Sequence, residues 1–185
     1  MSSQICILGD VVTDITLPQD GNEIKVRLGG ITHSARGLWA MNVNYDAKFI
    51  APNYLSNSII KYYKHHGASD VIQIGVVTGA PYTFLIGSVK ETGDQFYDFI
   101  LREQIEISFD SIRINKAECA YDDLLLISGN FDVKTITSSI TKDLNVHIDL
   151  SNNIQEITDL QYDTYHTIFL STSSELFKKH YKNLL

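Results

Sequence analysis

The sequence has little of what disulfide-stabilised, zinc-binding or membrane-spanning proteins depend on. It contains only two cysteines in 185 residues, Cys6 inside an apolar run and Cys119 without a partner motif. A disulfide framework or a zinc site is therefore not expected. Buried free thiols are typical of a reducing compartment, which favours a cytoplasmic location. No apolar run reaches about 18 residues, so we expect no membrane span.

Basic residues are also few. Lysine and arginine together number 15 against 22 acidic residues, which gives a formal net charge of -7. Nucleic-acid phosphates require a basic patch, so this balance argues against a nucleic-acid partner. With 44% hydrophobic residues the chain can bury a core, and its length predicts one domain.

Several motifs that carry chemistry are missing from the sequence. There is no G-x-G-x-x-G for a dinucleotide and no G-x-x-x-x-G-K-[ST] for a phosphate-binding loop. There is also no G-x-S-x-G, the motif that presents a nucleophilic serine in hydrolases. These three classes of enzyme are not indicated.

What the sequence does contain is an alternation of strand and helix patterns. This alternation predicts an α/β fold with a mostly parallel central sheet flanked by helices. The apolar run at 5–8 is typical of a central strand covered on both faces. Further core strands are expected at 48–51, 71–76, 123–128, 145–150 and 167–170. Helices are expected at 34–41 with Thr32 or Ser34 as N-cap, at 57–66 ended by Gly67, and at 131–141, 154–161 and 173–184.

Two segments have a different, β-rich character. Residues 15–28 form two extended stretches around Asp20-Gly21, which is a hairpin turn signal. Residues 82–108 are rich in β-branched and aromatic side chains and contain a turn at 92–94. We expect an antiparallel hairpin in the second segment and a small side sheet formed by both.

A polar pocket is predicted where the first strand ends. The strand runs into Gly9-Asp10, Asp14 follows four positions later, and Gly29-Gly30 precedes a helix. The carboxyl ends of strands in open α/β sheets are where ligands usually bind. Asp10 is interpreted mainly as structural.

Seven features appear in an order that resembles the amino-terminal part of the ribokinase-like (PfkB) carbohydrate and nucleoside kinases. They are ILGDVVTD at 7–14, the diglycine, the two β-rich segments, SGNFDV at 128–133, HIDLSNN at 147–153 and FLSTSSE at 169–175. The resemblance covers essentially all of 1–185. It implies a single ribokinase-like α/β portion, the substrate-binding half, with a lid formed by about 15–28 and 82–108.

The resemblance implies a set of substrate-binding residues. Asp14 would hold substrate hydroxyls, since a carboxylate can accept two hydrogen bonds from a vicinal diol. Gly29 and Gly30 would let the backbone approach the substrate, which a Cβ would block. Ser34, with His33 beside it, stands where the family commonly has a substrate-contacting asparagine. The lid often pairs between subunits in the family, which implies a homodimer.

The sequence also departs from the family. Of an Asn-x-x-Glu element associated with magnesium, Glu175 remains while Thr172 replaces the asparagine. The family places its anion hole and catalytic base in a Gly-Asp segment of its carboxyl half, but the Gly-Asp pairs here are at 9–10 and 93–94. ATP and Mg²⁺ are implied as cofactors, and we expect that this chain alone does not bind them. We expect a chain that stops before the ATP site, contains no catalytic residue and has no kinase turnover of its own.

Two functions remain open from the sequence. The first is a sugar or nucleoside kinase, present here as its substrate-binding and lid portion. The second is a non-catalytic ligand-binding or dimerisation module on the same fold. Asp149 at the end of a core strand either faces the cleft or is an ordinary strand-end acid.

Overall fold

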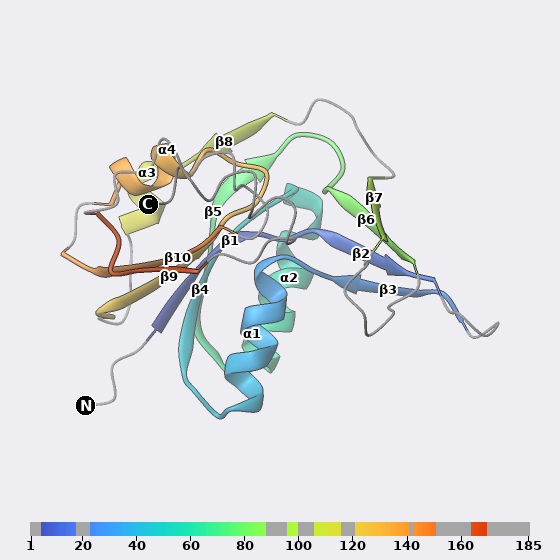
Figure 1. Cartoon of the computed structure of the whole chain (residues 1–185), viewed down its shortest axis with the longest axis horizontal. Coiled ribbons are helices and arrows are strands. Elements are labelled where there is room, and N and C mark those ends of the chain that lie inside the picture. The colour runs from blue at the N-terminus through green and yellow to red at the C-terminus, as the bar shows by residue number, and fades with distance from the viewer. Residues whose placement is uncertain are drawn as a thin grey trace, which may run out of the picture.

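A seven-stranded sheet forms the centre of the molecule (Figure 1). The structure is a computed structural model, and it describes residues 5–17, 23–87, 96–99, 106–115, 121–140, 143–150 and 164–169. The strands lie side by side in the order β11 (Thr167–Phe169), β10 (Asn145–Asp149), β9 (Asp123–Ile127), β1 (Ile5–Asp10), β4 (Tyr45–Ala51), β5 (Ala68–Val77) and β8 (Ile107–Phe109). Neighbours are parallel except β5 and β8. The prediction of a mostly parallel central sheet is confirmed.

Helices cover both faces of this sheet. On one face, α1 (Ile31–Ala40) and α2 (Ser56–His65) pack against side chains of β1 and β4, with a short 3-10 turn, η1 (Asn53–Leu55), before α2. On the other face lie α3 (Ser111–Asn115) and α4 (Val133–Ser138). Within β1, Ile7 faces the first core while Cys6 and Leu8 face the second. Both faces are buried, which explains why the strand is apolar without alternation.

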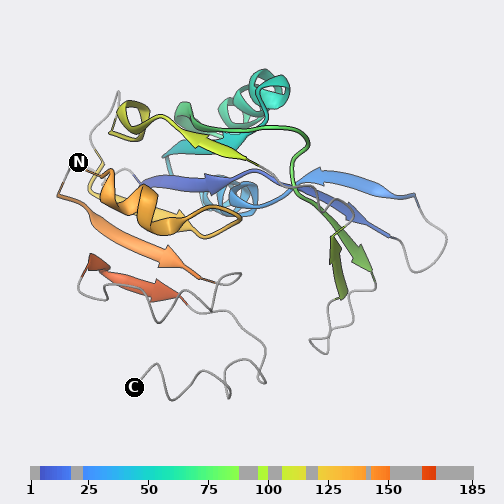
Figure 2. The ribbon, with the colours of Figure 1, turned by 90° about the horizontal axis from the view of Figure 1, so that it is seen from above.

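A second, four-stranded sheet projects from one end of the first (Figure 2). We call it the side sheet; its order is β3 (Lys25–Leu28), β2 (Thr13–Thr16), β6 (Thr83–Gly87) and β7 (Phe96–Phe99). The pairs β2–β3 and β6–β7 are antiparallel, as the two hairpin signals predict. The strands that join them, β2 and β6, are parallel, so the side sheet is mixed.

Two local expectations were wrong, and one helix was not predicted. The first helix begins at Ile31, and Gly30 rather than Thr32 or Ser34 is its N-cap residue; the Thr32 hydroxyl instead lies 2.9 Å from the Tyr63 hydroxyl. Residues 82–108 were expected to form one hairpin, but the end of this segment belongs to β8, which pairs with β5 in the central sheet. The helix α3 was not expected from the sequence. The helices expected at 154–161 and 173–184 lie outside the described residues.

No helix in the described part of the chain is long and apolar enough to cross a membrane. The side chain of Cys6 is fully buried and free. Burial raises the pKa of its thiol to about 12, so the thiol stays protonated and unreactive. Cys119 lies outside the described residues.

Candidate functional site at the carboxyl ends of the strands

The site lies where the strand order reverses. The chain adds β4 and β5 on one side of β1 and then returns to place β9 on the other side. The carboxyl ends of β1 and β9 therefore lie at a topological switch point, which is where open α/β sheets bind ligands. Asp10 ends β1 and Asp14 lies in β2, which begins three residues after β1 ends, so both acids lie at this edge.

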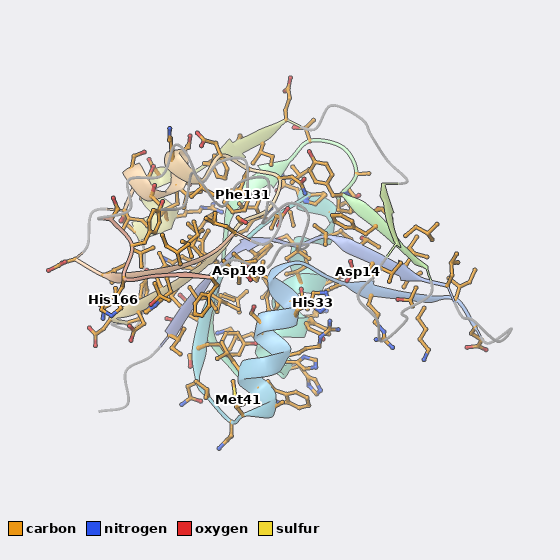
Figure 3. All side chains as sticks on the ribbon, viewed as in Figure 1. Asp14, His33, Met41, Phe131, Asp149 and His166 are labelled. Atoms are coloured by element: carbon orange, nitrogen blue, oxygen red, sulfur yellow. The ribbon has the colours of Figure 1, made fainter. Side chains whose placement is uncertain are left out.

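Asp14 is held by a residue of α1. Its carboxylate is buried, and its Oδ2 lies 2.8 Å from Nε2 of His33 (Figure 3). On the other side of the ring, Nη2 of Arg36 lies 2.8 Å from Nδ1 of His33. A guanidinium group can only donate, so Nδ1 accepts and the ring proton is on Nε2, which donates to Asp14. The three side chains form a hydrogen-bonded row with a neutral imidazole in the middle.

We call the second oxygen of Asp14, Oδ1, open because within the described residues it has no hydrogen-bond partner and is not among the fully buried unpaired polar atoms, although the side chain as a whole is only 9% exposed. The His33 side chain is 60% exposed, so the row reaches the surface. Asp14 can therefore accept a hydrogen bond from a ligand through Oδ1 while His33 fixes the orientation of the carboxylate.

The diglycine makes room for these acids. A Cβ on Gly29 would lie 2.3 Å from Oδ2 of Asp14, and a Cβ on Gly30 would lie 2.3 Å from the backbone oxygen of Asp10. Gly30 also has φ of 61°, a conformation that L side chains rarely adopt. Both glycines are thus required by the close approach of the protein's own groups, whereas their contact with a ligand stays a prediction.

Asp10 has partners inside the protein. Its Oδ2 accepts hydrogen bonds from the backbone nitrogen of Asn130 at 3.2 Å and from Nδ2 of the same residue at 3.3 Å. A Cβ on Gly129 would lie only 2.1 Å from Oδ1 of Asp10. Burial raises the pKa of Asp10, and the two bonds from Asn130 oppose that shift. The carboxyl group fastens the end of β1 to the loop after β9.

A buried hydroxyl lies beside this contact. Ser128 is 1% exposed, and its Oγ has no partner in the part of the chain that the structure describes. Leaving a buried donor unsatisfied costs about 1–3 kcal/mol, so such groups often mark functional sites. Sequence reasoning missed Ser128 as well as Asn130, although both belong to the SGNFDV segment.

The remaining predicted residues are placed differently. Ser34 is half-buried on α1, next to His33, and has no hydrogen bond to Asp14 among the described residues. Asp149 ends β10 at the same edge of the sheet, two strands from β1. Glu175 and Thr172 lie outside the described residues. No group of three or more His, Cys, Asp or Glu side chains in the described ranges could hold a metal ion.

Comparison with known proteins gives similarities in structure alone. No protein-family model and no curated protein matches the sequence. A microbiome-derived acarbose kinase has a TM-score of 0.59 and 13% identity over 99% of this chain and 67% of its own. A pyrophosphate-dependent kinase in the ribokinase family, complexed with a pyrophosphate analog and myo-inositol, has a TM-score of 0.58 and 11% identity over 90% of this chain and 61% of its own.

A third similar structure is an uncharacterized sugar kinase from Pyrococcus horikoshii in complex with ATP. Its TM-score is 0.54 and its identity 10%, over 86% of this chain and 57% of its own. This chain thus spans 57% to 67% of the length of the three solved chains. The sheet order, the side sheet and these similarities agree, and the resemblance noted in the sequence is confirmed for the fold. This chain has the α/β fold of the ribokinase-family and PfkB carbohydrate kinases, and it corresponds to part of the length of those kinases.

Proposed function

We propose that this chain is the substrate-binding portion of a ribokinase-type kinase, which phosphorylates a hydroxyl of a sugar, a related polyol or a nucleoside. The observation that carries the proposal is the Asp14 carboxylate at the switch point, with Oδ2 held by His33 and Oδ1 open. A carboxylate with one oxygen fixed and one open is suited to hold a substrate hydroxyl in a defined direction. The solved kinases of the same fold support this class of substrate.

Each part of the site has a role in this proposal. Asp14 accepts the hydrogen bond of a substrate hydroxyl, and His33 keeps the carboxylate from rotating. Gly29 and Gly30 bring the substrate close to the backbone at the start of α1, and Ser34 offers a hydroxyl from the next helical position. The side sheet acts as a lid that excludes water, which would otherwise compete as the phosphoryl acceptor.

The donor proposed from the family resemblance is ATP with Mg²⁺. ATP supplies the γ-phosphoryl group, and Mg²⁺ neutralises the charge of the phosphates. Glu175 is the residue proposed to be linked to magnesium, and it lies outside the described residues, so no step is assigned to it. We expect no turnover by these 185 residues alone, because neither of their Gly-Asp pairs lies in a segment like that of the family's catalytic base. The buried free thiol of Cys6 supports a cytoplasmic location.

Ligand binding by the purified chain tests the proposal. A panel of neutral sugars, polyols and nucleosides is screened by the shift in Tm, and Kd is then measured by calorimetry. We expect Asp14→Asn to weaken binding about tenfold or more, because an amide accepts less strongly and its nitrogen cannot accept. The control Asp122→Asn changes an exposed acid at the opposite end of β9 and should leave Kd unchanged. Equal binding by native chain and Asp14→Asn contradicts the proposal.

A second candidate function is a dimerisation module. The strand β3 is an edge of the side sheet, and Ile24 beside it and Val26 within it are 62% and 66% exposed. Unpaired strand edges with apolar side chains favour pairing with another chain. A homodimer through the side sheet should dissociate on dilution and be weakened by Val26→Lys in sedimentation experiments. Dimerisation without any ligand-dependent shift in Tm would favour this function over the kinase.

A further inference from the structure

Positive charge gathers around Asp14 in a chain that is acidic overall. The formal net charge of the chain is -7, yet no acidic residue occurs between Glu23 and Asp46. This segment contains Lys25, Arg27 and Arg36, and it supplies both β3 and α1. The two elements that surround Asp14 therefore carry the opposite sign from the molecule as a whole.

The strand register puts two of these cations on the same face as Asp14. In the antiparallel pair of β2 and β3, Asp14 is opposite Arg27 and Thr16 is opposite Lys25. Directly opposite residues project from the same face of a sheet, with Cβ atoms about 4.5–5.5 Å apart. The contact of Asp14 with His33 shows that this face is turned toward the start of α1. Arg27 and Lys25 thus project from the face that carries the proposed substrate residue.

The third cation approaches from the helix. Arg36 uses one of its N–H groups to donate to His33, which in turn donates to Asp14. A guanidinium group has five N–H donors in a planar fork, so four remain for another partner. The hydrogen bond to His33 holds the guanidinium near the edge of the site, next to the exposed imidazole.

Two of these cations, Arg27 and Lys25, are exposed and form no ion pair among the described residues. Glu23 lies before β3, at the outer end of the side sheet, and the Asp10 carboxyl is buried against Gly129 and Asn130. These three cations thus lie on the two elements next to Asp14 and form no ion pair with it among the described residues. Such a cluster raises the local concentration of anions and favours their binding.

We propose that the substrate of this site is an anionic polyol, a sugar or related compound that bears a phosphate or a carboxylate as well as hydroxyls. This inference rests on the proposed function, in which Asp14 binds a substrate hydroxyl. Asp14 binds a hydroxyl of the substrate, and Arg27 and Arg36 bind its anionic group at the exposed edge of the site. Arginine suits this role because its planar fork forms two parallel hydrogen bonds with a carboxylate or a phosphate. Lys25, further out on β3, attracts the anion without fixing its geometry.

The test compares matched neutral and anionic ligands by calorimetry at low ionic strength. The sets are glucose, glucose 6-phosphate and gluconate; ribose and ribose 5-phosphate; and fructose and fructose 6-phosphate. Inorganic phosphate is included as an anion that carries no polyol. We expect at least one anionic member to bind about tenfold more tightly than its neutral parent, since charge-assisted pairs contribute most of that difference. A comparison of the sugar phosphates with gluconate shows whether the site prefers a phosphate or a carboxylate.

Variants separate the two ends of the substrate. Arg27→Gln removes a cation that forms no ion pair among the described residues, so it should weaken the anionic ligand about fivefold or more and leave the neutral parent unchanged. Arg36→Lys keeps the charge but loses the planar fork, and it should weaken the anionic ligand less. Asp14→Asn should weaken both ligands. Lys61→Gln, a change of an exposed cation on α2, is the control and should affect neither.

Each of the following outcomes would contradict the inference. If neutral sugars bind through Asp14 as tightly as their anionic partners, the substrate is neutral and the proposed function stands without this inference. If inorganic phosphate binds as tightly as the phosphorylated sugars, the cations form an anion site unconnected with Asp14. If no member of this panel binds, the inference is wrong, and the proposed function is wrong as well if the wider panel of sugars, polyols and nucleosides also fails to bind.

Discussion

At the same edge of the central sheet, two buried carboxyl groups each lie against a glycine, but their surroundings differ. Asp14 lies against Gly29 and Asp10 against Gly129, each so closely that a Cβ on the glycine would meet a carboxylate oxygen at 2.3 or 2.1 Å. The Asp10 carboxyl group receives two hydrogen bonds from Asn130, both at Oδ2. Asp14 receives one bond from a side chain that is exposed to solvent, and its second oxygen is open.

The difference separates a structural acid from a binding acid. The Asp10 carboxyl group accepts two hydrogen bonds at Oδ2 from the loop after β9, and burial raises its pKa. It therefore connects two parts of the central sheet. Asp14 connects the side sheet to α1 through one oxygen and retains one acceptor for a ligand. The same local arrangement, an acid on a glycine, thus provides a fixed junction at one position and a candidate substrate contact at the other.

The largest effect is expected at Gly30, which lies between the two acids. Gly30→Ala would place a Cβ 2.3 Å from the backbone oxygen of Asp10 at a residue with φ of 61°. The positive-φ backbone of Gly30 (φ 61°, ψ −134°) costs a residue with a Cβ about 1–3 kcal/mol and the overlap about 1–3 kcal/mol, so we expect a loss of about 3 kcal/mol in the free energy of unfolding. Urea denaturation measures this loss.

The matched control is Gly37→Ala, in the same helix. A Cβ on Gly37 would meet nothing within 4 Å, so alanine should stabilise the protein by about 0.5–1 kcal/mol through its helix propensity. Because Gly30 is obstructed by backbone, removal of the Asp10 side chain should not rescue Gly30→Ala. Rescue by Asp10→Ala would show that the obstacle is the carboxyl group and would contradict the account.

A smaller effect is expected when alanine replaces the glycine that lies against each acid. Gly129→Ala should cost about 2 kcal/mol, because the enclosed Asp10 carboxyl must move away from Asn130. Gly29→Ala should cost about 1 kcal/mol, because the Asp14 carboxylate can shift together with the exposed His33 side chain that holds it. Both costs should fall when the acid is removed, in the double variants with Asp10→Ala and Asp14→Ala. Additive costs in these double-mutant cycles would show that the glycines and acids do not interact.

The sequence was informative about the elements whose signals are local. The apolar run of β1 and the turn signal between β2 and β3 correctly predicted a buried parallel strand and a hairpin. The strand β8 was assigned to the wrong sheet, since its partner β5 is chosen by packing and not by its own residues. The diglycine predicted a helix start, but the N-cap was misplaced, since the helix begins directly after Gly30.

The site was predictable only where its residues are close in sequence. Asp14 and the diglycine were singled out, and the structure brings them into contact. The role of Asn130 was not predictable, since it meets Asp10 across 120 residues and through a strand order that the sequence does not specify. Arg27 was missed because its place beside Asp14 depends on the register of β2 and β3. Arg36 could have been found, because positions i and i+3 on a helix are neighbours and His33 was already a candidate.

The smallest effect expected concerns the charge of Asp10. Burial raises the pKa of this carboxyl above its ordinary value of 3.8, so in the pH range between the two values the folded state holds a proton that the unfolded state has lost. The free energy of unfolding therefore decreases as the pH rises through that range. Asp10→Asn removes the charge but keeps the shape and an oxygen for the donors of Asn130. At neutral pH we expect the variant to be more stable by about 1 kcal/mol, a rise in Tm of about 2–4 °C.

The pH dependence distinguishes this explanation from a general improvement in packing. The gain from Asp10→Asn should disappear below pH 3.8, where the native carboxyl group is itself uncharged in both states. Thermal unfolding of both proteins across the acidic and neutral range measures the difference directly. A lower Tm for Asp10→Asn at neutral pH would mean that the bonds from Asn130 stabilise the charged carboxylate more than burial destabilises it. Asp10 would then be a stable internal anion, and the contrast with Asp14 would rest on solvent access rather than on charge.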